Sequence, residues 1–219
     1  MPSGKTEPPA RGRFILGSMT LSEKRQNALP NLRLTDESEW IIQARAGSEQ
    51  AWLVLVHAHQ EAVFRLAYLL LRDPADADDV AQEAFVRAFL SLARFDETRP
   101  FRPWLLQITR NLARNRRRSL GRYLRHLARW QADAGETAVA PPPSDSRTNG
   151  RLLWQAVQTL PLKGQEIVYL RYFLELSEAE TAVILNIPAG TAKSRLSRAL
   201  AQLRGVIERD FPELREMHR

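Results

Sequence analysis

The chain has 219 residues with no cysteine, and 44% of its residues are hydrophobic. This apolar share suits a globular protein, while the lack of cysteine excludes a disulfide framework, zinc-binding thiolates and thiol catalysis. A formal net charge of +7 and a pI near 10.3 require an anionic partner, which could be nucleic acid, an acidic protein or a membrane surface.

Residues 1–34 are rich in proline, glycine and charge and show no sustained hydrophobic period, which predicts a disordered extension. Arg11 and Arg13 precede only three apolar residues, Phe14 to Leu16, and these are too few for a signal-peptide core. No later apolar run approaches the ~20 residues of a membrane span. We therefore expect a cytoplasmic protein without membrane insertion.

Helical periodicity starts at about residue 35 and defines a first domain, residues 35–130. A short helix ends at Gly47, and Ser48 can cap a longer second helix. Asp73 followed by proline suits the start of a third helix, which ends near Leu92. The apolar positions expected to be buried recur at helical spacing: Trp52, Leu55, Val56, Val63, Leu66, Ala67, Leu70, Ala81, Ala84, Phe85, Ala88 and Leu92.

The start of the third helix carries a cluster of acids in an otherwise basic chain: Asp73, Asp76, Asp78, Asp79 and Glu83. Carboxylates stabilise a helix amino terminus by roughly 0.3–1 kcal/mol each, which accounts for the cluster as far as Asp78. Asp79, Gln82 and Glu83 lie beyond the first turn, on the face opposite Phe85. This exposed acidic face predicts a basic protein partner.

A loop over residues 94–100 precedes a fourth helix that is dense in arginine. Between Arg110 and Arg129 the sequence has eight arginines and no acid. Because so many like charges repel one another unless an anion neutralises them, the cluster predicts contact with nucleic-acid phosphates. The alternative, an arginine face exposed only to solvent, is disfavoured by the same repulsion.

Along this fourth helix Trp104, Asn111 and Asn115 fall nearly on one line, with Arg118 close to it. Amides can read exposed base edges, and aromatic rings can stack on unpaired bases. The alternative for Trp104 is a core position beside Leu105.

Residues 131–150 consist largely of alanine, glycine, aspartate, serine and a run of three prolines, a composition that predicts a linker. Helical periodicity returns over residues 151–209, the second domain, and residues 210–219 form a tail. Ser177 and Glu180 have the spacing of a capping box. A tight turn at residues 186–188 then precedes a long final helix.

The final helix presents two faces. Its apolar face consists of Leu196, Ala199, Leu200, Leu203 and Ile207. Thr191, Ser194 and Arg198 project from the opposite side, with Lys193 and Arg195 at the edges. A short capped helix, a turn and a helix with small polar and basic groups in its first half are typical of a helix-turn-helix that binds DNA. The alternative is an amphipathic helix with a solvated polar face.

Several site classes are not expected. The sequence has no glycine-rich phosphate loop and no nucleophile–base spacing, so we predict no enzyme activity and no cofactor. The histidines, His57, His59, His126 and His218, are scattered, so no metal site is expected.

Three motifs resemble those of the bacterial sigma-70 family. Residues 76–85 (DADDVAQEAF) resemble its core-polymerase-binding motif, and residues 101–105 (FRPWL), followed by Ile108 and Arg110-Asn111, resemble its promoter-melting helix. Residues 188–196 (PAGTAKSRL) resemble the recognition helix of region 4. With only regions 2 and 4 present, the match over about residues 35–208 resembles the extracytoplasmic-function (ECF) subfamily.

The resemblance implies an all-α fold of two small helical domains, a four-helix region 2 and a helix-turn-helix region 4, joined by a flexible linker. It implies a role in transcription initiation, with core RNA polymerase (through its β′ clamp helices), promoter DNA and an anti-sigma factor as partners. The implied polymerase-binding residues are Asp76, Asp79, Gln82 and Glu83. The implied −10 residues are Phe101, Trp104, Asn111, Arg114, Asn115 and Arg118, and the implied −35 residues are Thr191, Lys193, Ser194, Arg195 and Arg198.

The sequence departs from the family pattern at two of these places. Pro103 replaces the small helix former that usually precedes the tryptophan, although proline is tolerated in a first helical turn. Ser197 stands where some relatives carry a larger side chain toward DNA, which affects the expected −35 preference.

Three other functions are compatible with these patterns. A stand-alone helix-turn-helix regulator would bind operator duplex without polymerase. An RNA-binding antiterminator would use the arginine run and would not need residues 151–219. A metal-dependent nuclease would cleave DNA when magnesium or manganese is added.

Overall fold

The computed structural model describes residues 37–128 and 149–215, and every regular element within these ranges is a helix. The predicted all-α class is therefore confirmed for the described residues. None of the described helices is long and apolar enough to cross a membrane. The predictions for residues 1–34, most of the linker and the last four residues lie outside the described ranges.

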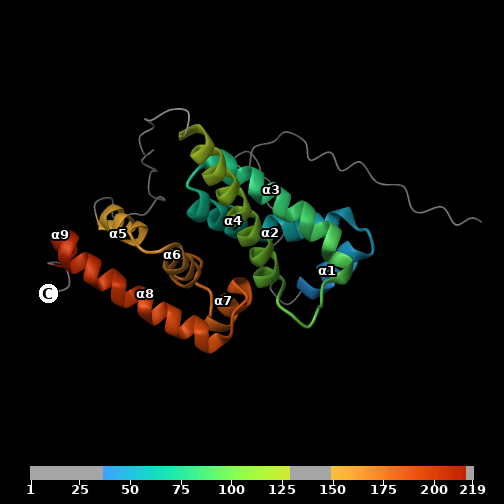
Figure 1. The fold of residues 1–219 in the computed structure, drawn as a ribbon. Helices are drawn as coiled ribbons and strands as arrows, with labels where there is room; N and C mark the ends of the chain where they lie inside the picture. The colour runs from blue at the N-terminus through green and yellow to red at the C-terminus, as the bar shows by residue number, and fades with distance from the viewer. Residues whose placement is uncertain (1–36, 129–148, 216–219) are drawn as a thin grey trace, which may run out of the picture. The chain divides into compact units, whose positions relative to one another are not determined.

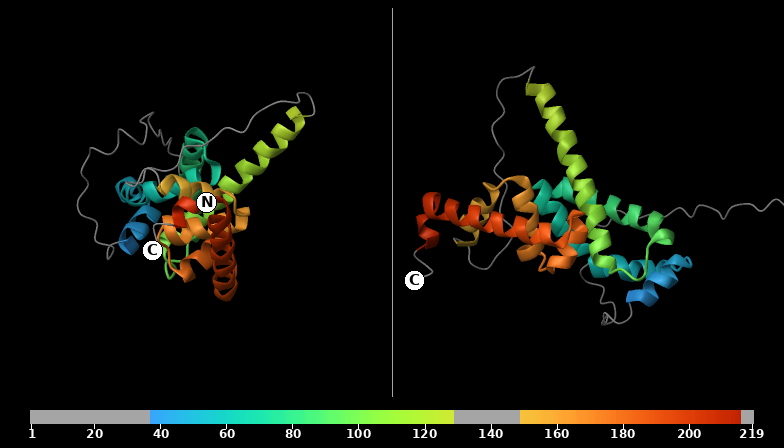
Figure 2. Two further views of the ribbon diagram at one scale, coloured as in Figure 1. Left: turned by 90° about the vertical axis from the view of Figure 1, so that its left-hand side faces the viewer. Right: turned by 60° about the horizontal axis from the view of Figure 1, so that its bottom comes forward.

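The first group of helices comprises α1 (Glu37–Arg45), α2 (Glu49–Leu71), α3 (Pro74–Ser91) and α4 (Phe101–Ala128), with a 3-10 turn, η3 (Leu92–Arg94), after α3. Helices α2, α3 and α4 pack against one another, and α1 packs on α2 (Figure 1). The carboxyl-terminal turns of α4 extend well beyond its neighbours (Figure 2).

Local capping chemistry sets the helix boundaries in this group. The Ser48 hydroxyl accepts a hydrogen bond from the Ala51 amide at 3.3 Å and starts α2. The Asp73 carboxylate accepts one from the Asp76 amide at 2.7 Å, with Pro74 in the first turn of α3. Both predicted caps are confirmed, and both follow from the preference of these residues for helix N-termini.

The core of this group contains the predicted apolar stripes. The predicted apolar positions of α2 are all buried except Val56, which is partly buried. The predicted stripe that starts at Ala81 in α3 and ends at Leu92 in η3 is buried throughout. Such a stripe forms because residues three and four apart share one face of a helix.

The second group consists mostly of short helices. Its bounds are α5 (Asn149–Gln158), α6 (Leu162–Val168), η4 (Tyr169–Phe173), α7 (Glu178–Leu185), α8 (Ala189–Asp210) and α9 (Pro212–Arg215). Helix α8 packs against α5, α6, α7 and α9, so the longest helix organises the group. Three aromatic rings from α5 and η4, those of Trp154, Tyr169 and Phe173, pack together within the group.

The turn between α7 and α8 has the predicted helix-turn-helix form. Ser177 and Glu180 make both hydrogen bonds of a capping box at the start of α7. Asn186 ends α7 in the left-handed region at φ 53°, a conformation that asparagine tolerates better than most residues. Helix α8 then starts directly after Pro188, and Figure 1 shows the short α7 leading into the long α8.

The structure adds three features that the sequence pattern did not predict. Helix α5 starts at Asn149, inside the predicted linker, and Pro212 starts the one-turn helix α9 inside the predicted tail. Residues 169–173 form a π turn. Helix ends vary by one or two residues with packing, and a single π turn has no marker in hydrophobic periodicity.

Candidate functional site

The acidic face predicted on the third helix is exposed on α3. Asp79, Gln82 and Glu83 are exposed, whereas Asp76 is partly buried. The Gln82 amide donates a hydrogen bond to Asp78 at 2.8 Å, and Arg87 donates one to Glu83 at 2.6 Å. These pairs order side chains along one face of the helix, and the face remains available to a basic partner.

One arginine of α4 lies against this acidic face. The Arg116 Nε donates a hydrogen bond to Asp76 at 2.9 Å, and the guanidinium lies 3.5 Å from the Asp79 carboxylate. The hydrogen bond to Asp76 and the charges of Asp76 and Asp79 raise the pKa of Arg116. The four predicted polymerase-binding residues therefore share one surface, with Asp76 at its edge next to α4.

The start of α4 places the two predicted aromatic residues differently. Phe101 is only 1% exposed and packs among His59, Phe95 and Trp104. In this conformation the Phe101 ring cannot stack on a base, and it supports Trp104 instead. Trp104 is partly buried, with its ring centroid 4.7 Å from that of Phe95. Part of its side chain therefore packs in the core, and part is accessible to solvent.

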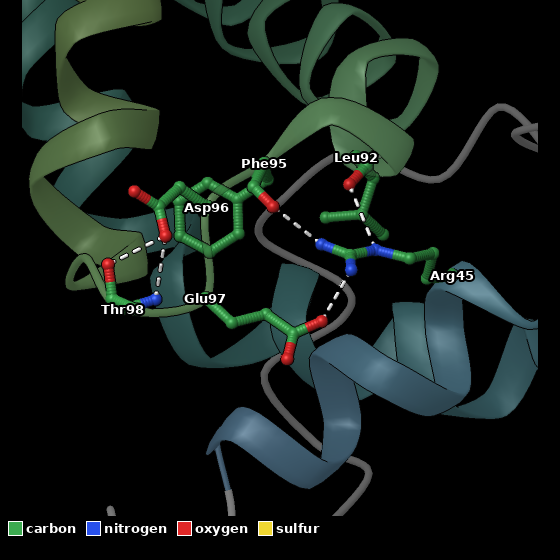
Figure 3. Close-up of polar contacts among 6 residues, drawn as sticks. All are labelled: Arg45, Leu92, Phe95, Asp96, Glu97 and Thr98. Atoms are coloured by element: carbon green, nitrogen blue, oxygen red, sulfur yellow. Dashed lines mark hydrogen bonds and ion pairs between the residues drawn. The ribbon is translucent and has the colours of Figure 1, made fainter.

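The segment before α4 is fixed by Arg45, the last residue of α1 (Figure 3). The Arg45 Nε donates to the Leu92 carbonyl at 3.2 Å, a terminal nitrogen donates to the Phe95 carbonyl at 2.6 Å, and the third nitrogen pairs with Glu97. The sequence does not predict this role, because the contacts join residues about 50 positions apart and a basic residue at a helix end is common.

The same segment ends in a short hydrogen-bonded turn. The Asp96 carboxylate accepts hydrogen bonds from the Thr98 hydroxyl at 2.6 Å and from the Thr98 amide at 3.0 Å (Figure 3). These bonds lower the pKa of Asp96. The loop predicted over residues 94–100 thus has a defined conformation, and it leads into the aromatic residues of α4.

The predicted nucleic-acid residues farther along α4 share one side of the helix. Asn111, Asn115 and Arg118 are exposed, and Arg114 is partly buried. At about 100° per residue, Asn111, Asn115 and Arg118 lie within a narrow sector that also contains Trp104. The amides and the tryptophan edge therefore face the same direction, as single-strand recognition requires.

Arg110, beside this sector, makes a buried ion pair that the sequence did not predict. Its guanidinium donates a hydrogen bond at 2.8 Å to Oε2 of Glu166 on α6, and the two side chains are 7% and 1% exposed. Arg114 Nε lies 3.6 Å from Oε1 of the same carboxylate. At that distance the charges attract, but Oε1 has no hydrogen-bond partner.

Further polar contacts join α2 and α4 to the second group of helices. Arg72 donates to the Gln165 side chain at 3.0 Å, and Arg102 and Gln107 donate to backbone carbonyls of Leu174 and Val183, both at 3.2 Å. Helix α7 also packs against α4. Of the two donors on α4, Gln107 lies next to the sector that holds the asparagines, whereas Arg102 lies on the far side of the helix.

The predicted recognition residues lie at the start of α8. Lys193, Ser194 and Arg198 are exposed, whereas Thr191 and Arg195 are partly buried. The Ser194 hydroxyl donates to the Thr191 carbonyl at 3.1 Å, and Arg198 Nε donates to the Ser194 carbonyl at 3.2 Å. These contacts hold the side chains against the helix, while the remaining guanidinium donors of Arg198 stay exposed.

The predicted apolar face of α8 is buried to different degrees. Ala199 and Leu203 are buried, and Leu196, Leu200 and Ile207 are partly buried. The polar and apolar sides of the helix therefore lie as predicted. Among the described residues no group of histidine and carboxylate side chains is arranged to hold a metal ion.

The chain matches two family descriptions that follow one another along the sequence. Residues 55–123 match "Sigma-70 region 2", and residues 150–203 match "Sigma-70, region 4". The first match contains most of α2, all of α3 and most of α4, and the second contains the helix-turn-helix.

Individual proteins resemble the chain over most of its length. It is 31% identical to the ECF RNA polymerase sigma factor SigW of Bacillus subtilis, over 75% of this chain and 92% of that protein. It is 33% identical to the RNA polymerase sigma factor NccH of Alcaligenes xylosoxydans xylosoxydans, over 75% of this chain and 91% of that protein. A solved structure of the sigma factor RpoE with the anti-sigma factor NepR, from Bartonella quintana, has a similar fold, with a TM-score of 0.60 at 22% identity over 71% of this chain and 95% of that chain.

Proposed function

The chain belongs to the sigma-70 family, within its ECF subfamily, and we propose that its two groups of helices divide the work of transcription initiation. It is a sigma factor that binds core RNA polymerase and directs it to promoters. Its role is recognition, since the catalytic chemistry of RNA synthesis belongs to the polymerase. Its site of action is the cytoplasm, where the polymerase and the chromosome are found.

The acidic face of α3 is the proposed docking surface for the polymerase. Asp79, Gln82 and Glu83 are exposed on one side of the helix and would contact the β′ clamp helices, with Asp76 at the edge. Electrostatic complementarity to a basic surface would speed the encounter and orient the two proteins. The rest of the chain is strongly basic, so this face is distinct in charge from the DNA-binding surfaces.

The exposed side of α4 is the proposed site for the −10 element. Asn111 and Asn115 would read bases taken out of the duplex, while Arg114 and Arg118 would contact phosphates. Trp104, supported by buried Phe101, offers a partly exposed ring for stacking. Unstacking a base costs a few kcal/mol, and contacts to the released base offset that cost.

The start of α8 is the proposed site for the −35 element. Ser194 and Arg198 project from its exposed side with Lys193 nearby, and Thr191 and Arg195 lie at the margins. In helix-turn-helix proteins the amino-terminal half of the second helix enters the major groove. Arg198 would read a guanine edge, and Lys193 would contact the DNA backbone.

One observation carries the proposal: the two asparagines of α4 are exposed on the same side as Trp104, on a helix whose charge suits a DNA strand. A stand-alone regulator would bind duplex DNA through its helix-turn-helix alone, so it would not require exposed amides on α4.

The experiment that tests the −10 assignment is a permanganate footprint of promoter DNA bound by holoenzyme. We expect Asn111→Ala and Asn115→Ala each to reduce reactive thymines at the start site at least tenfold, while co-purification with core polymerase stays normal. Gln131→Ala, outside the described helices, serves as the amide control. Normal melting by both asparagine variants would refute the assignment.

A further inference from the structure

The carboxylate of Glu166 lies buried among arginine side chains of α4. Glu166 is 1% exposed, and its charged neighbours are arginines of α4: Arg110 at 2.8 Å and Arg114 at 3.6 Å. Arg117 also lies near this group: burial and the charge of Arg72 lower its pKa overall, against smaller opposing effects of Tyr169 and Glu166. A single acid thus faces several arginines, and the group remains positively charged as a whole.

These arginines border the proposed −10 surface. Arg110 and Arg114 lie one turn apart and directly precede Asn111 and Asn115, so the arginine row runs beside the asparagine row. A DNA strand read by the asparagines would bring its phosphates to the arginine row. The same arginines cannot bind Glu166 and phosphates at once, because each guanidinium donates its paired hydrogen bonds to one anion at close range.

From this overlap we propose that Glu166 acts as an internal phosphate mimic, which holds α6 and its neighbours on α4 until a DNA strand replaces it. The contact is an autoinhibitory latch: Glu166 competes with the promoter strand for Arg110 and Arg114. This inference rests on the proposed role of α4 in binding the −10 strand.

The surrounding contacts suit a latch that opens. Arg72, Arg102 and Gln107 donate to uncharged acceptors, so Glu166 is the only carboxylate that accepts a hydrogen bond from α4 in the described contacts with α6 and α7. The charge of Glu180 on α7 also acts on Arg102, but without such a bond. Its Oε1 lacks a hydrogen-bond partner, and an unsatisfied buried oxygen weakens the closed state. Once the contact opens, water can reach both the carboxylate and the arginines.

The test uses the full chain with one isosteric change, Glu166→Gln, and a matched control, Glu175→Gln. Glu175 lies in the same group of helices but is exposed, so the control makes the same change in net charge. Affinity for a fluorescein-labelled oligothymidylate is measured by anisotropy without polymerase. We expect Glu166→Gln to bind at least fivefold more tightly than the parent chain, and Glu175→Gln to change affinity less than twofold.

A distance measurement accompanies the binding assay. Because the chain has no cysteine, Ala93→Cys with Ala179→Cys gives two specific labelling sites, both at exposed positions. We expect a single narrow distance distribution in the parent chain, and a longer, broader distribution in Glu166→Gln or when the oligonucleotide is added. Circular dichroism confirms that the variant keeps its helix content.

A second variant covers the case in which Glu166→Gln does not fold. Cysteines at Gln107 and Val183, whose side chain and carbonyl are in contact, can be joined by a short thiol cross-linker. The cross-linked protein should lose oligonucleotide affinity at least fivefold relative to the same protein before cross-linking.

The inference is overturned if Glu166→Gln and Glu175→Gln bind alike, if separation occurs without a gain in affinity, or if cross-linking leaves affinity unchanged. Failure of the proposed function would look different, because promoter opening by the holoenzyme would then be insensitive to Asn111 and Asn115. The two outcomes are measured in separate assays.

Discussion

Arg45 shows how one side chain can fix a segment that no regular element holds. Its guanidinium joins the end of α1 to the carbonyls of Leu92 and Phe95 and to Glu97. The ion pair is partly exposed, so its charge contributes little. The stabilisation comes mainly from donors that reach two carbonyls lying side by side, a geometry that arginine offers and lysine does not.

We predict that Arg45→Ala lowers the free energy of unfolding by about 1–3 kcal/mol, because the Phe95 carbonyl loses its donor and the Leu92 carbonyl keeps only the Phe95 amide. Arg45→Lys should recover less than half of that loss. Urea denaturation measures both values, with Arg94→Ala, an exposed arginine of the same segment, as the control. Equal stability of Arg45→Ala and Arg94→Ala would contradict the role assigned to Arg45.

At the residue scale, the sequence predicted surface positions better than buried polar ones. Asp79, Asn111 and Arg198 are exposed as expected, because helix periodicity alone decides which side of a helix they occupy. Phe101 is buried and Arg110 is paired with Glu166. Both outcomes depend on residues distant in sequence, which periodicity cannot identify.

At the element scale, the capping box of α7 positions the helix-turn-helix. Ser177 and Glu180 each accept a hydrogen bond from the other's backbone amide. Burial raises the pKa of Glu180, but the hydrogen bonds from Ser177 and the charges of Arg102 and Arg171 outweigh it, so the pKa is lowered overall. The folded state therefore favours the ionised form of the Glu180 side chain.

This lowered pKa predicts a pH-dependent contribution to stability. A carboxylate with a depressed folded-state pKa stabilises the fold above its unfolded pKa, and the contribution is lost as pH falls through the folded value. Glu180→Gln should therefore be less stable than the parent chain at pH 7, by up to about 1 kcal/mol, and the difference should shrink toward pH 3. Thermal unfolding across this range measures it; a constant difference would contradict the assignment.

Helix α8 carries the second prediction at this scale. Arg198→Ala should weaken binding of holoenzyme to a promoter by about 1–3 kcal/mol, the usual value of a good arginine–guanine contact. Arg204→Ala is the control, since Arg204 is exposed but lies on another side of the helix beyond its amino-terminal half. Promoter-binding titrations compare the two. Equal losses of promoter affinity in the two variants would contradict a specific contact of Arg198, because they would show that the loss of positive charge alone weakens binding.

The elements themselves were largely predictable. Caps at Ser48, Asp73 and Ser177 gave the starts of three helices, because a local hydrogen bond fixes each of them. The π turn at residues 169–173 was not predictable, since it arises where aromatic rings of α5 and η4 pack together. Local chemistry sets helix starts, and tertiary packing sets irregular turns.

At the scale of the whole molecule, charge is divided between surfaces. The net charge of +7 comes with an acidic face on α3 and basic surfaces on α4 and α8. The acidic face and the basic surface of α4 meet where Arg116 pairs with Asp76 and lies 3.5 Å from Asp79. Since exposed charges are screened over ~8 Å at physiological salt, only the parts of these surfaces that are farther apart than this act independently.

The central claim is that the acidic face recruits polymerase while the basic surfaces select the promoter. Run-off transcription with purified core polymerase tests it most directly, comparing the parent chain, Asp79→Arg with Glu83→Arg, and the control Glu61→Arg, an exposed acid of α2. We predict a promoter-specific transcript from the parent chain and the control, and none from the double variant. A full-length transcript from the double variant, or none from the parent chain on any promoter of its host, would contradict the account.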